Sequence, residues 1–439
     1  MFSWRRKGTS RGKKQKKQKQ KQKEVEIPRH YLCPITLDLM KDPVTLSSGI
    51  TYDRESIEIW LEEGNFTCPV TNQVLRSLDQ IPNHSLRKMI QDWCVANRNS
   101  GVERIPTPRI PITSPEVCEI LFSIMDSKRR LDQCGCLDSV QRIKKWGMES
   151  ERNRRCIIAN DTSAVLAAAF DAFASECDSF HRNSNVLEEI LSVLNWMFPL
   201  DKDSQLHLGS YSSLRCMVWF LNCKDLSVKQ NSIVALKELL SCDHQLGEKL
   251  AAIDGFNQTL FNFIKDPICP SITKASLMVI FHIISSSSSN ERIKSDFVEM
   301  GLVSLLLETI VQSEKSLCEK ALGVIDKLCD SKQGRQVAYD NALAMPILVK
   351  KILRVSELAT DYSVSTIWKL SKVENKYEER VLIEALQVGA FQKLLLLIQL
   401  GCGDETKEKA TELLKLLNPY RAGLECIDSV DFKSLKRSF

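Results

Sequence analysis

The sequence predicts two folded domains: a small α+β domain near the amino terminus, then an all-α repeat domain that fills most of the chain. Three observations support this fold class. Residues 27–98 combine a hairpin pattern with two short amphipathic helices, whereas residues 115–418 contain helical patterns only. The helical region also repeats a pattern of small and apolar residues with a period in the forties, which is typical of stacked helical repeats.

Charge is distributed unevenly along the 439 residues. The chain carries 60 Lys and Arg against 55 Asp and Glu, a formal net charge of +5. Residues 1–26 alone hold eleven basic and two acidic residues, or +9, so the other residues sum to −4. We expect this nearly apolar-free tail to be disordered. Its role stays open between a nuclear signal read by an importin, an anchor to anionic lipid or nucleic acid, and a solvated tail without a partner.

Composition favours an intracellular protein. The hydrophobic fraction of 43% and charged fraction of 26% are ordinary for a soluble protein. No apolar run is long enough for a transmembrane helix, and the first residues lack the apolar stretch of a secretory signal. The sixteen cysteines are scattered through apolar helical patterns, so we expect buried free thiols. The predicted location is cytoplasmic, with a nuclear location left open.

The small domain, residues 27–100, begins with a hairpin and a helix. Residues 43–46 and 50–52 are strand-like and flank a turn in which Gly49 supplies the unusual backbone conformation. Asp53 is a good N-cap for a helix that runs to about residue 63 and ends at Gly64. The apolar face of this helix is Ile57, Trp60 and Leu61.

A second helix and a linker complete this part of the chain. Asn83 is the predicted cap of the helix. Its apolar stripe is Leu86, Met89, Ile90 and Trp93. Residues 101–114 contain three prolines, which make an extended, semi-stiff linker.

Two similar phrases stand 35 residues apart in the small domain: Cys33-Pro34-Ile35-Thr36 and Cys68-Pro69-Val70-Thr71. A proline beside a branched apolar residue holds a hydrophobic side chain in water at low entropic cost, which favours two exposed, preorganised loops for protein binding. A zinc-binding RING domain would need paired Cys-x2-Cys ligands. The candidate ligands here form no such pair, so we expect neither metal nor another cofactor.

The helical region, residues 115–420, contains two recurring columns. A small residue leads apolar residues one, four and seven positions later, at intervals of 44, 45, 42 and 47 residues, with Thr411 as the one departure. These small residues are Ser232, Ser276, Ala321, Ser363 and Ala410. A second column consists of a Gly or Asn that recurs once per repeat before another helix. These residue types favour a left-handed turn, and the positions are Gly255, Gly301, Asn341 and Gly389. The period resembles armadillo or HEAT repeats, which stack into a superhelix with a concave face. Residues 115–225 are less regular, residues 285–289 are a predicted loop, and residues 421–439 a tail.

Five blocks of the small domain resemble a U-box. They are Ile27-Pro28 with Tyr31–Ile35, Met40–Val44, Ser48–Arg54, Cys68–Thr71 and Ile81–Asn83. A U-box followed by armadillo repeats is similar to the plant U-box family, particularly its short members. The resemblance implies a zinc-free RING-like fold, held by hydrogen bonds in which Ser47, Ser48, Asp53 and Thr71 are expected to take part.

The resemblance also implies a function and a site. U-box proteins are ubiquitin ligases that dock a conjugating enzyme carrying ubiquitin as a thioester, with no covalent ligase intermediate. The residues expected to dock that enzyme are Ile35, Leu37, Trp60, Pro69 and Asn72. The residues expected to be structural are Cys33, Pro34, Asp53, Cys68, Val70 and Thr71. The repeats would recruit an unknown protein substrate, and several family members act in defence and stress signalling.

One position departs from the family. Active members often carry Arg or Lys just after the second Pro-Val-Thr, where this chain has Asn72. We therefore keep a second hypothesis, an armadillo scaffold with a weakly active or inert U-box. A nuclear import adaptor would show repeated Trp-x-x-Asn pairs, of which only Trp219 and Asn222 fit. U-boxes often pair with themselves, so self-association stays open.

Overall fold

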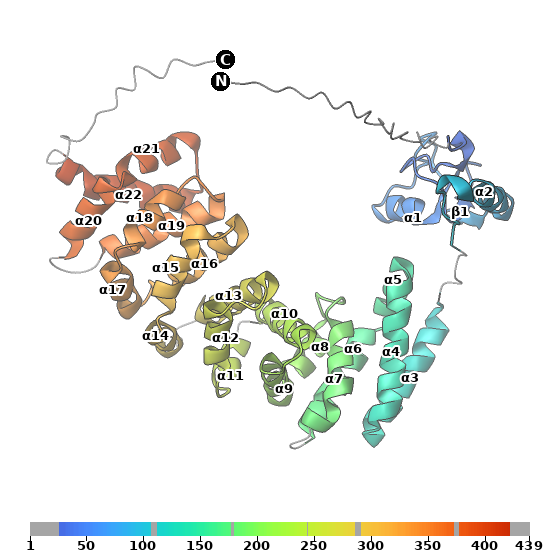
Figure 1. The fold of residues 1–439 in the computed structure, drawn as a ribbon, viewed down its shortest axis with the longest axis horizontal. Coiled ribbons are helices and arrows are strands. Elements are labelled where there is room, and N and C mark those ends of the chain that lie inside the picture. The colour runs from blue at the N-terminus through green and yellow to red at the C-terminus, as the bar shows by residue number, and fades with distance from the viewer. Residues whose placement is uncertain are drawn as a thin grey trace, which may run out of the picture. The chain divides into compact units, whose positions relative to one another are not determined.

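The computed structural model describes residues 26–106, 112–176, 180–243, 245–285, 291–372 and 377–421. The predicted basic tail except Glu26, the centre of the linker, the loop after residue 285 and the tail after residue 421 lie outside these ranges. The chain divides into two compact units, Met1–Pro111 and Ile112–Phe439 (Figure 1). Each unit has its own hydrophobic core.

A three-stranded antiparallel sheet forms the centre of the first unit. Strands β1 (Pro43–Thr45) and β2 (Thr51–Asp53) make the predicted hairpin, with Val44 opposite Tyr52. Gly49 has φ of 79°, the left-handed conformation that the tight turn requires. The sequence pattern did not predict β3 (Ile81–Pro82), which pairs with β1 and gives the order β2-β1-β3.

Helices α1 (Arg54–Glu62) and α2 (His84–Ala96) pack beside this sheet, with short 3-10 turns at Arg29–Tyr31 and Arg98–Ser100. The predicted cap of α2 is confirmed, because the Asn83 side chain accepts the Leu86 amide at 3.0 Å. Asp53 is the N-cap residue of α1, as predicted, but its side chain makes no capping bond. Met89 is also not part of the buried stripe, since half of it is exposed while Cys94 is buried.

The second unit is a row of helices (Figure 1). Their bounds are α3 Ser114–Arg130, α4 Gln133–Glu149, α5 Glu151–Ile158, α6 Thr162–Ser175, α7 Phe180–Leu194, α8 Lys202–Leu208, α9 Tyr211–Leu221, α10 Leu226–Cys242, α11 Leu246–Ala251, α12 Phe256–Lys265, α13 Pro270–Ser285, α14 Glu291–Glu299, α15 Leu302–Gln312, α16 Lys315–Leu328, α17 Lys332–Asp340, α18 Ala344–Lys351, α19 Glu357–Ser371, α20 Tyr377–Gln387, α21 Ala390–Leu400 and α22 Asp404–Arg421. Every third helix from α4 to α22 packs against the next of its kind. We call these seven the inner-row helices.

The small-residue column explains how the inner-row helices pack. Ser232, Ser276, Ala321, Ser363 and Ala410 lie on α10, α13, α16, α19 and α22, and all are 0% exposed. A small side chain at the contact lets neighbouring helices approach closely, so the predicted periodicity is confirmed. The column continues into the less regular region, where Ser139 of α4 and Val186 of α7 are buried at the corresponding positions. There a valine replaces the small residue, which hides the repeat in the sequence.

The second column is confirmed at three of its four positions. Gly255, Gly301 and Gly389 have φ between 76° and 86° and each precedes a helix. Asn341 is different, because its φ of −90° is extended rather than left-handed. Asp161, with φ of 53°, makes the same kind of turn before α6 without a glycine.

Membrane-spanning segments were sought in the described ranges. No single helix there combines the length and hydropathy that crossing a bilayer requires. Two helix pairs, bent by 71° and 75°, meet the criteria only when the members of each pair are taken together.

Candidate functional site

The two Cys-Pro loops have the same backbone structure. The Cys33 carbonyl accepts the Leu37 amide at 2.8 Å, and the Cys33 amide donates to the Asp38 carbonyl at 2.8 Å. The second loop repeats both bonds: the Cys68 carbonyl accepts the Asn72 amide at 2.8 Å, and the Cys68 amide donates to the carbonyl five residues later at 2.9 Å. Each loop is therefore a closed turn built around its cysteine.

The same strained conformation occurs in both turns. Leu37 has φ of 60° and Asn72 has φ of 55°. Asparagine tolerates this left-handed region better than most residues, whereas a leucine there is unusual. The conformation carries both side chains outward, and Leu37 is 71% exposed. An asparagine at position 72 is therefore compatible with the left-handed backbone conformation, independently of any role in binding.

Adjacent residues of β2 hold the two sulfur atoms. The Tyr52 hydroxyl lies 3.0 Å from Cys68 Sγ and accepts the Val70 amide at 3.3 Å. The Asp53 amide donates to Cys33 Sγ at 3.3 Å. Both cysteines and Tyr52 are 0% exposed. One strand therefore anchors both loops and fixes the distance between them.

The surroundings of Cys68 favour its thiolate. Burial raises the pKa of this thiol, but the polar groups of Ser48, Thr71 and Tyr52 near the sulfur outweigh burial and lower the pKa to about 6. The Ser48 hydroxyl is buried and has no hydrogen bond of ordinary geometry within the described residues, so its contribution comes from lying near the sulfur. Ser48 and Thr71 lie near the Cys68 sulfur, and their part in a hydrogen-bond network stays a prediction.

Asp53 has a structural role different from capping. Its Oδ1 accepts the amides of Lys41 and Asp42 at 2.7 and 2.8 Å. Arg54 then pairs with the Asp42 carboxylate at 2.6 Å and donates its amide to the Asp42 carbonyl at 2.9 Å. These bonds join the chain after the first loop to the start of α1. Ser47 completes the network by donating to the Ser77 carbonyl at 3.1 Å.

Comparisons with known proteins agree with this geometry. Residues 27–99 match the U-box domain family. Residues 116–437 match the family described as the plant U-box protein ARM repeat region. The chain belongs to the plant U-box family. As a U-box protein of this family it is a RING-type ubiquitin ligase, with an armadillo-repeat region after the U-box.

The similarity to curated plant U-box proteins extends over nearly the whole chain. U-box domain-containing protein 21 of Arabidopsis thaliana is 46% identical over 417 residues, covering 94% of both proteins. U-box domain-containing protein 20 is 42% identical over 444 residues, covering 99% of this chain and 98% of that protein. E3 ubiquitin-protein ligase PUB22 is 32% identical over 422 residues, covering 89% and 94%.

The docking residues predicted from the U-box family lie on the two loops and on α1. Ile35 and Leu37 are exposed on the first loop, and Pro69 is half-buried on the second. Trp60 packs against the core from α1, and its indole donates to the Thr67 carbonyl at 2.8 Å. That bond ties α1 to the second loop. Trp60 is thus partly structural, as well as a candidate for docking.

Three further apolar side chains were missed in the sequence. Phe66 and Val74 flank the second loop and are 55% and 76% exposed, while Val70 within the loop is 53% exposed. Val70 was expected to be structural only. The sequence did contain a signal for this exposed surface, because an apolar residue stands on each side of the second Cys-Pro phrase. These flanking residues lie outside the blocks that resemble the family.

The described residues of this U-box protein contain no group of three His, Cys, Asp or Glu side chains placed to hold a metal ion. Cys33 and Cys68 are free cysteines inside the core and form no disulfide. Their hydrogen bonds to Asp53 and Tyr52 hold the loops in this structure.

The inner-row helices of the armadillo region present a second surface. Trp368 of α19 donates to Glu412 of α22 at 2.6 Å, and Lys372 lies 3.7 Å from the Trp368 ring centroid. Lys369 pairs with Asp326 at 2.8 Å and Asp330 at 2.6 Å. Burial lowers the pKa of Lys369, but these two carboxylates outweigh it and raise the pKa. Charged and aromatic side chains thus link successive repeats.

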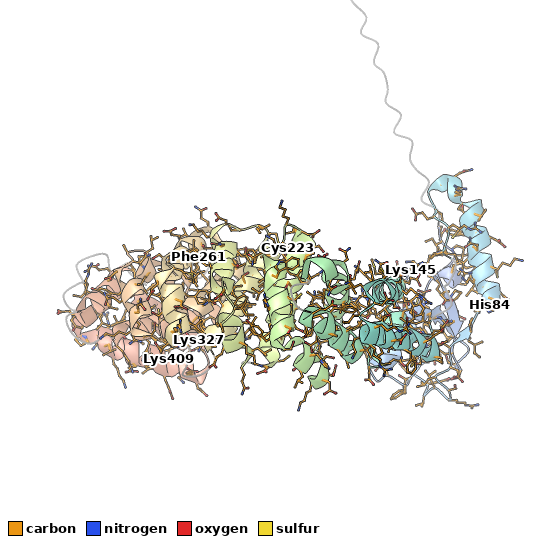
Figure 2. The ribbon with its side chains drawn as sticks, turned by 90° about the horizontal axis from the view of Figure 1, so that it is seen from below. His84, Lys145, Cys223, Phe261, Lys327 and Lys409 are labelled. Carbon is orange, nitrogen blue, oxygen red and sulfur yellow. The ribbon has the colours of Figure 1, made fainter. Side chains whose placement is uncertain are left out.

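The surface of the inner-row helices lies on one side of the row of repeats. Lys327 of α16 and Lys409 of α22 lie toward one side of the row, and Cys223 and Phe261 toward the other (Figure 2). The Trp-x-x-Asn pair considered above, Trp219 and Asn222, is at the end of α9, which is not an inner-row helix. It therefore does not begin an asparagine ladder along the inner row.

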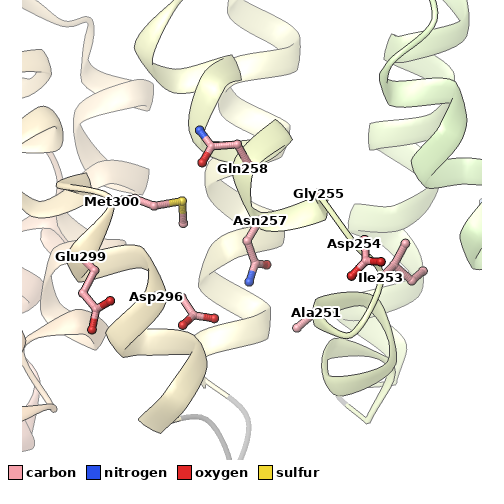
Figure 3. Close-up of a pocket in the computed structure, with 9 residues that line it drawn as sticks. All are labelled: Ala251, Ile253, Asp254, Gly255, Asn257, Gln258, Asp296, Glu299 and Met300. Carbon is pink, nitrogen blue, oxygen red and sulfur yellow. The ribbon is translucent and has the colours of Figure 1, made fainter.

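A pocket of about 490 Å³ lies between α11–α12 and α14 (Figure 3). Its lining is Ala251, Ile253, Asp254, Gly255, Asn257, Gln258, Asp296, Glu299 and Met300. Three carboxylates make it acidic. Because none of its residues belongs to an inner-row helix, this pocket is separate from the surface described above.

Proposed function

We propose that the two loops and α1 dock a ubiquitin-conjugating enzyme charged with ubiquitin. The observation that supports this most directly is the pair of matching turns anchored on β2, each presenting apolar side chains. Ile35, Leu37, Trp60, Pro69 and Asn72 make the docking surface. Preorganised apolar loops lose little entropy on binding, which suits a partner that must exchange repeatedly.

The proposed reaction needs no nucleophile from this chain. A substrate lysine attacks the thioester on the conjugating enzyme, and the ligase contributes proximity and orientation. Cys68 has a depressed pKa, which would suit a nucleophile, but its sulfur is buried and held by Tyr52. Its thiolate therefore supports the loop and does not accept ubiquitin.

Self-ubiquitination in a reconstituted reaction tests the docking surface. We expect the wild-type chain to modify itself and Ile35→Ala and Pro69→Ala to lose most of this activity. Val95→Ala is the matched control, because Val95 is 55% exposed on α2, outside both loops. Activity that survives both loop substitutions, or falls equally in the control, would contradict the docking surface.

We also propose that the armadillo repeats recruit the substrate through the inner-row surface. The support is the row of aromatic and charged side chains from α16 to α22. Proximity labelling with Ile112–Phe439 compares the wild type with Trp368→Ala. The expected result is loss of a subset of labelled proteins, and unchanged labelling would count against this surface.

The alternative is a scaffold whose U-box is weakly active, and its support is Asn72 in place of a basic residue. Discharge of ubiquitin from the conjugating enzyme to free lysine separates the two. A rate no higher than that without the chain favours the scaffold.

A role in plant defence or stress signalling and a partly nuclear location are proposals from the family and from the basic tail. Replacing the lysines between residues 13 and 23 by glutamine would test the tail. A fluorescent fusion should then lose its nuclear fraction, and an unchanged distribution would remove the nuclear signal from consideration.

A further inference from the structure

A small basic pocket lies between two neighbouring repeats of the second unit. It has a volume of about 150 Å³. Its lining residues are Ser313, Lys315, Cys318, Lys350, Lys351, Arg354 and Val355. They come from the end of α15, the first turns of α16, the end of α18 and the turn before α19. At about 30 Å³ per water, the space holds roughly five water molecules, so it suits one small group.

The positive charge of this pocket has no counterion among the described residues. Lys315, Lys350, Lys351 and Arg354 make no ion pair with a described carboxylate, and the Lys351 ammonium donates to the Ile310 carbonyl at 2.9 Å. Two acidic residues next to the pocket lining in the sequence are engaged elsewhere. Glu314 pairs with Lys274, and Glu319 accepts the Ser356 hydroxyl.

An unpaired hydroxyl lies in the same pocket. Ser313 Oγ is buried and has no hydrogen-bond partner among the described residues. Buried hydroxyls are nearly always paired, so one left free beside four cations indicates an absent acceptor. The pocket is also at the amino-terminal end of α16, whose N-cap residue, Glu314, makes no capping bond. Free amides at that end favour an anion.

The surrounding chain positions these cations. Lys393 donates to the carbonyls of Val349, Lys350 and Ile352 at 2.7, 3.0 and 3.2 Å, which fixes the end of α18. Leu353, with φ of 61°, is strained and donates its amide to Thr360 Oγ1 at 3.0 Å. Burial and the neighbouring Arg354 both lower the pKa of Lys393. A strained turn that brings like charges together is a cost that an anionic ligand would offset.

We propose that this pocket binds the phosphate group of a phosphorylated side chain on a partner protein. Three oxygens and nearly two negative charges match the four cations and the free hydroxyl. Room for one phosphate, and not for several, favours a phosphorylated residue over a multiply phosphorylated lipid headgroup. The inference rests on the proposed role of the repeats in recruiting substrates, and makes that recruitment dependent on phosphorylation.

The test uses the purified full chain and two immobilised peptide mixtures. Both have random flanking residues, around a central phosphoserine or phosphotyrosine in one and the unmodified residue in the other. We expect retention on the phosphorylated mixture at least tenfold above the other. Lys350→Gln with Arg354→Gln should remove this difference. Lys249→Gln with Lys265→Gln changes the net charge equally at exposed sites outside the pocket, and should keep it.

Ser313→Ala gives a second, independent readout. It should reduce phosphopeptide retention severalfold without lowering the melting temperature, because the hydroxyl makes no bond in the free chain. The proposal is overturned if the wild type retains both peptide mixtures equally. It is also overturned if the pocket double variant and the control double variant lose the preference for phosphorylated peptides equally. Binding only to vesicles containing phosphoinositides also overturns it, in favour of a membrane ligand. No conjugating enzyme or ubiquitin is present, so an inert U-box would not affect the result.

Discussion

Cys68 shows how one buried residue supports a loop by its charge as well as its shape. Its sulfur is held by Tyr52 and lies near Ser48 and Thr71, which together favour the thiolate. The depressed pKa means that the folded U-box releases a proton that the unfolded chain keeps until pH 9.0. Stability from this source is fully present above that pH and is lost as the pH falls through about 6.

The first prediction concerns this proton. Between pH 6 and 8.5 the unfolding free energy of Met1–Pro111 should rise with pH, by up to about 1.4 kcal/mol per pH unit. Cys68→Ser removes the titrating thiol, so most of the slope should disappear. Urea denaturation of both proteins across this range measures the effect. Parallel slopes for wild type and variant would show that Cys68 remains a neutral thiol in the fold.

The second prediction concerns Asn72. Asn72→Arg should raise the rate of ubiquitin discharge severalfold, since a guanidinium reaches further and makes charge-assisted hydrogen bonds. The left-handed φ of 55° costs an arginine roughly 1–2 kcal/mol, but Leu37 tolerates the same conformation in the first loop. Asn72→Gly keeps the turn and removes the side chain, so it serves as control. A discharge rate unchanged by arginine would remove the proposed role of this position.

Individual residues were predictable where a local rule acts alone. Asn83 caps α2 through its Oδ1, which accepts the Leu86 amide, while its Nδ2 donates to the hydroxyls of Thr45 and Thr51 and so does not compete with the cap. Asp53 occupies the predicted N-cap position of α1 but makes no capping bond, because the amides eleven and twelve residues earlier take its carboxylate. Met89 matched the helical stripe but is half exposed, so the described residues cover only part of that side of α2. Such long-range competition leaves no local trace in a sequence.

Glycines decide how closely the elements of the armadillo region approach. Gly323 of α16 lies under Tyr362 of α19 and Phe281 of α13, whose ring centroids are 6.1 Å apart. Gly334 is more tightly enclosed. A Cβ there would overlap the Leu328 carbonyl, and its amide donates to Ser331 Oγ at 3.0 Å. The start of α17 therefore has no space for a side chain.

The third prediction follows from this enclosure. Gly334→Ala should destabilise the armadillo region by about 2–3 kcal/mol, because backbone rather than a flexible side chain must move. The melting temperature should fall by roughly 5 °C or more. Gly403→Ala is the control, since a Cβ there meets nothing within 4 Å. If both variants melt alike, the contact at Gly334 relaxes more easily than the structure indicates.

At the scale of elements, the hairpin and the repeat columns were predictable and β3 was not. The hairpin needs only a glycine turn between two strand patterns. Ile81 and Pro82 form a two-residue strand with both side chains exposed, so no alternation marks it. Asn341 occupied a glycine position without its conformation, because asparagine permits a left-handed turn without requiring one.

The armadillo region behaves as a one-dimensional stack in which each repeat is covered mainly by its neighbours. The inner-row helix α22 covers α19 and contributes Ala410, Leu413 and Leu417 to the core. The U-box has a separate core. Stability and catalysis should therefore respond separately to changes at the two ends of the chain.

The fourth prediction uses this separation. A chain ending at Gly401 lacks α22 and leaves part of the apolar surface of α19 uncovered. Its main thermal transition should shift downward by several degrees, while its rate of ubiquitin discharge should stay within about twofold. Calorimetry and the discharge reaction measure the two effects. A matching loss of discharge would mean that the U-box depends on the last repeat.

The anchoring of both loops on β2 has a genetic consequence. Since Tyr52 and Asp53 are neighbours in the chain, one inserted residue in the turn at 47–49 would rotate β2 and point Tyr52 away from Cys68. Both loops would lose their anchors, although every side chain meant to touch the conjugating enzyme remained. An insertion in this turn should therefore abolish function as severely as substitutions in the loops themselves.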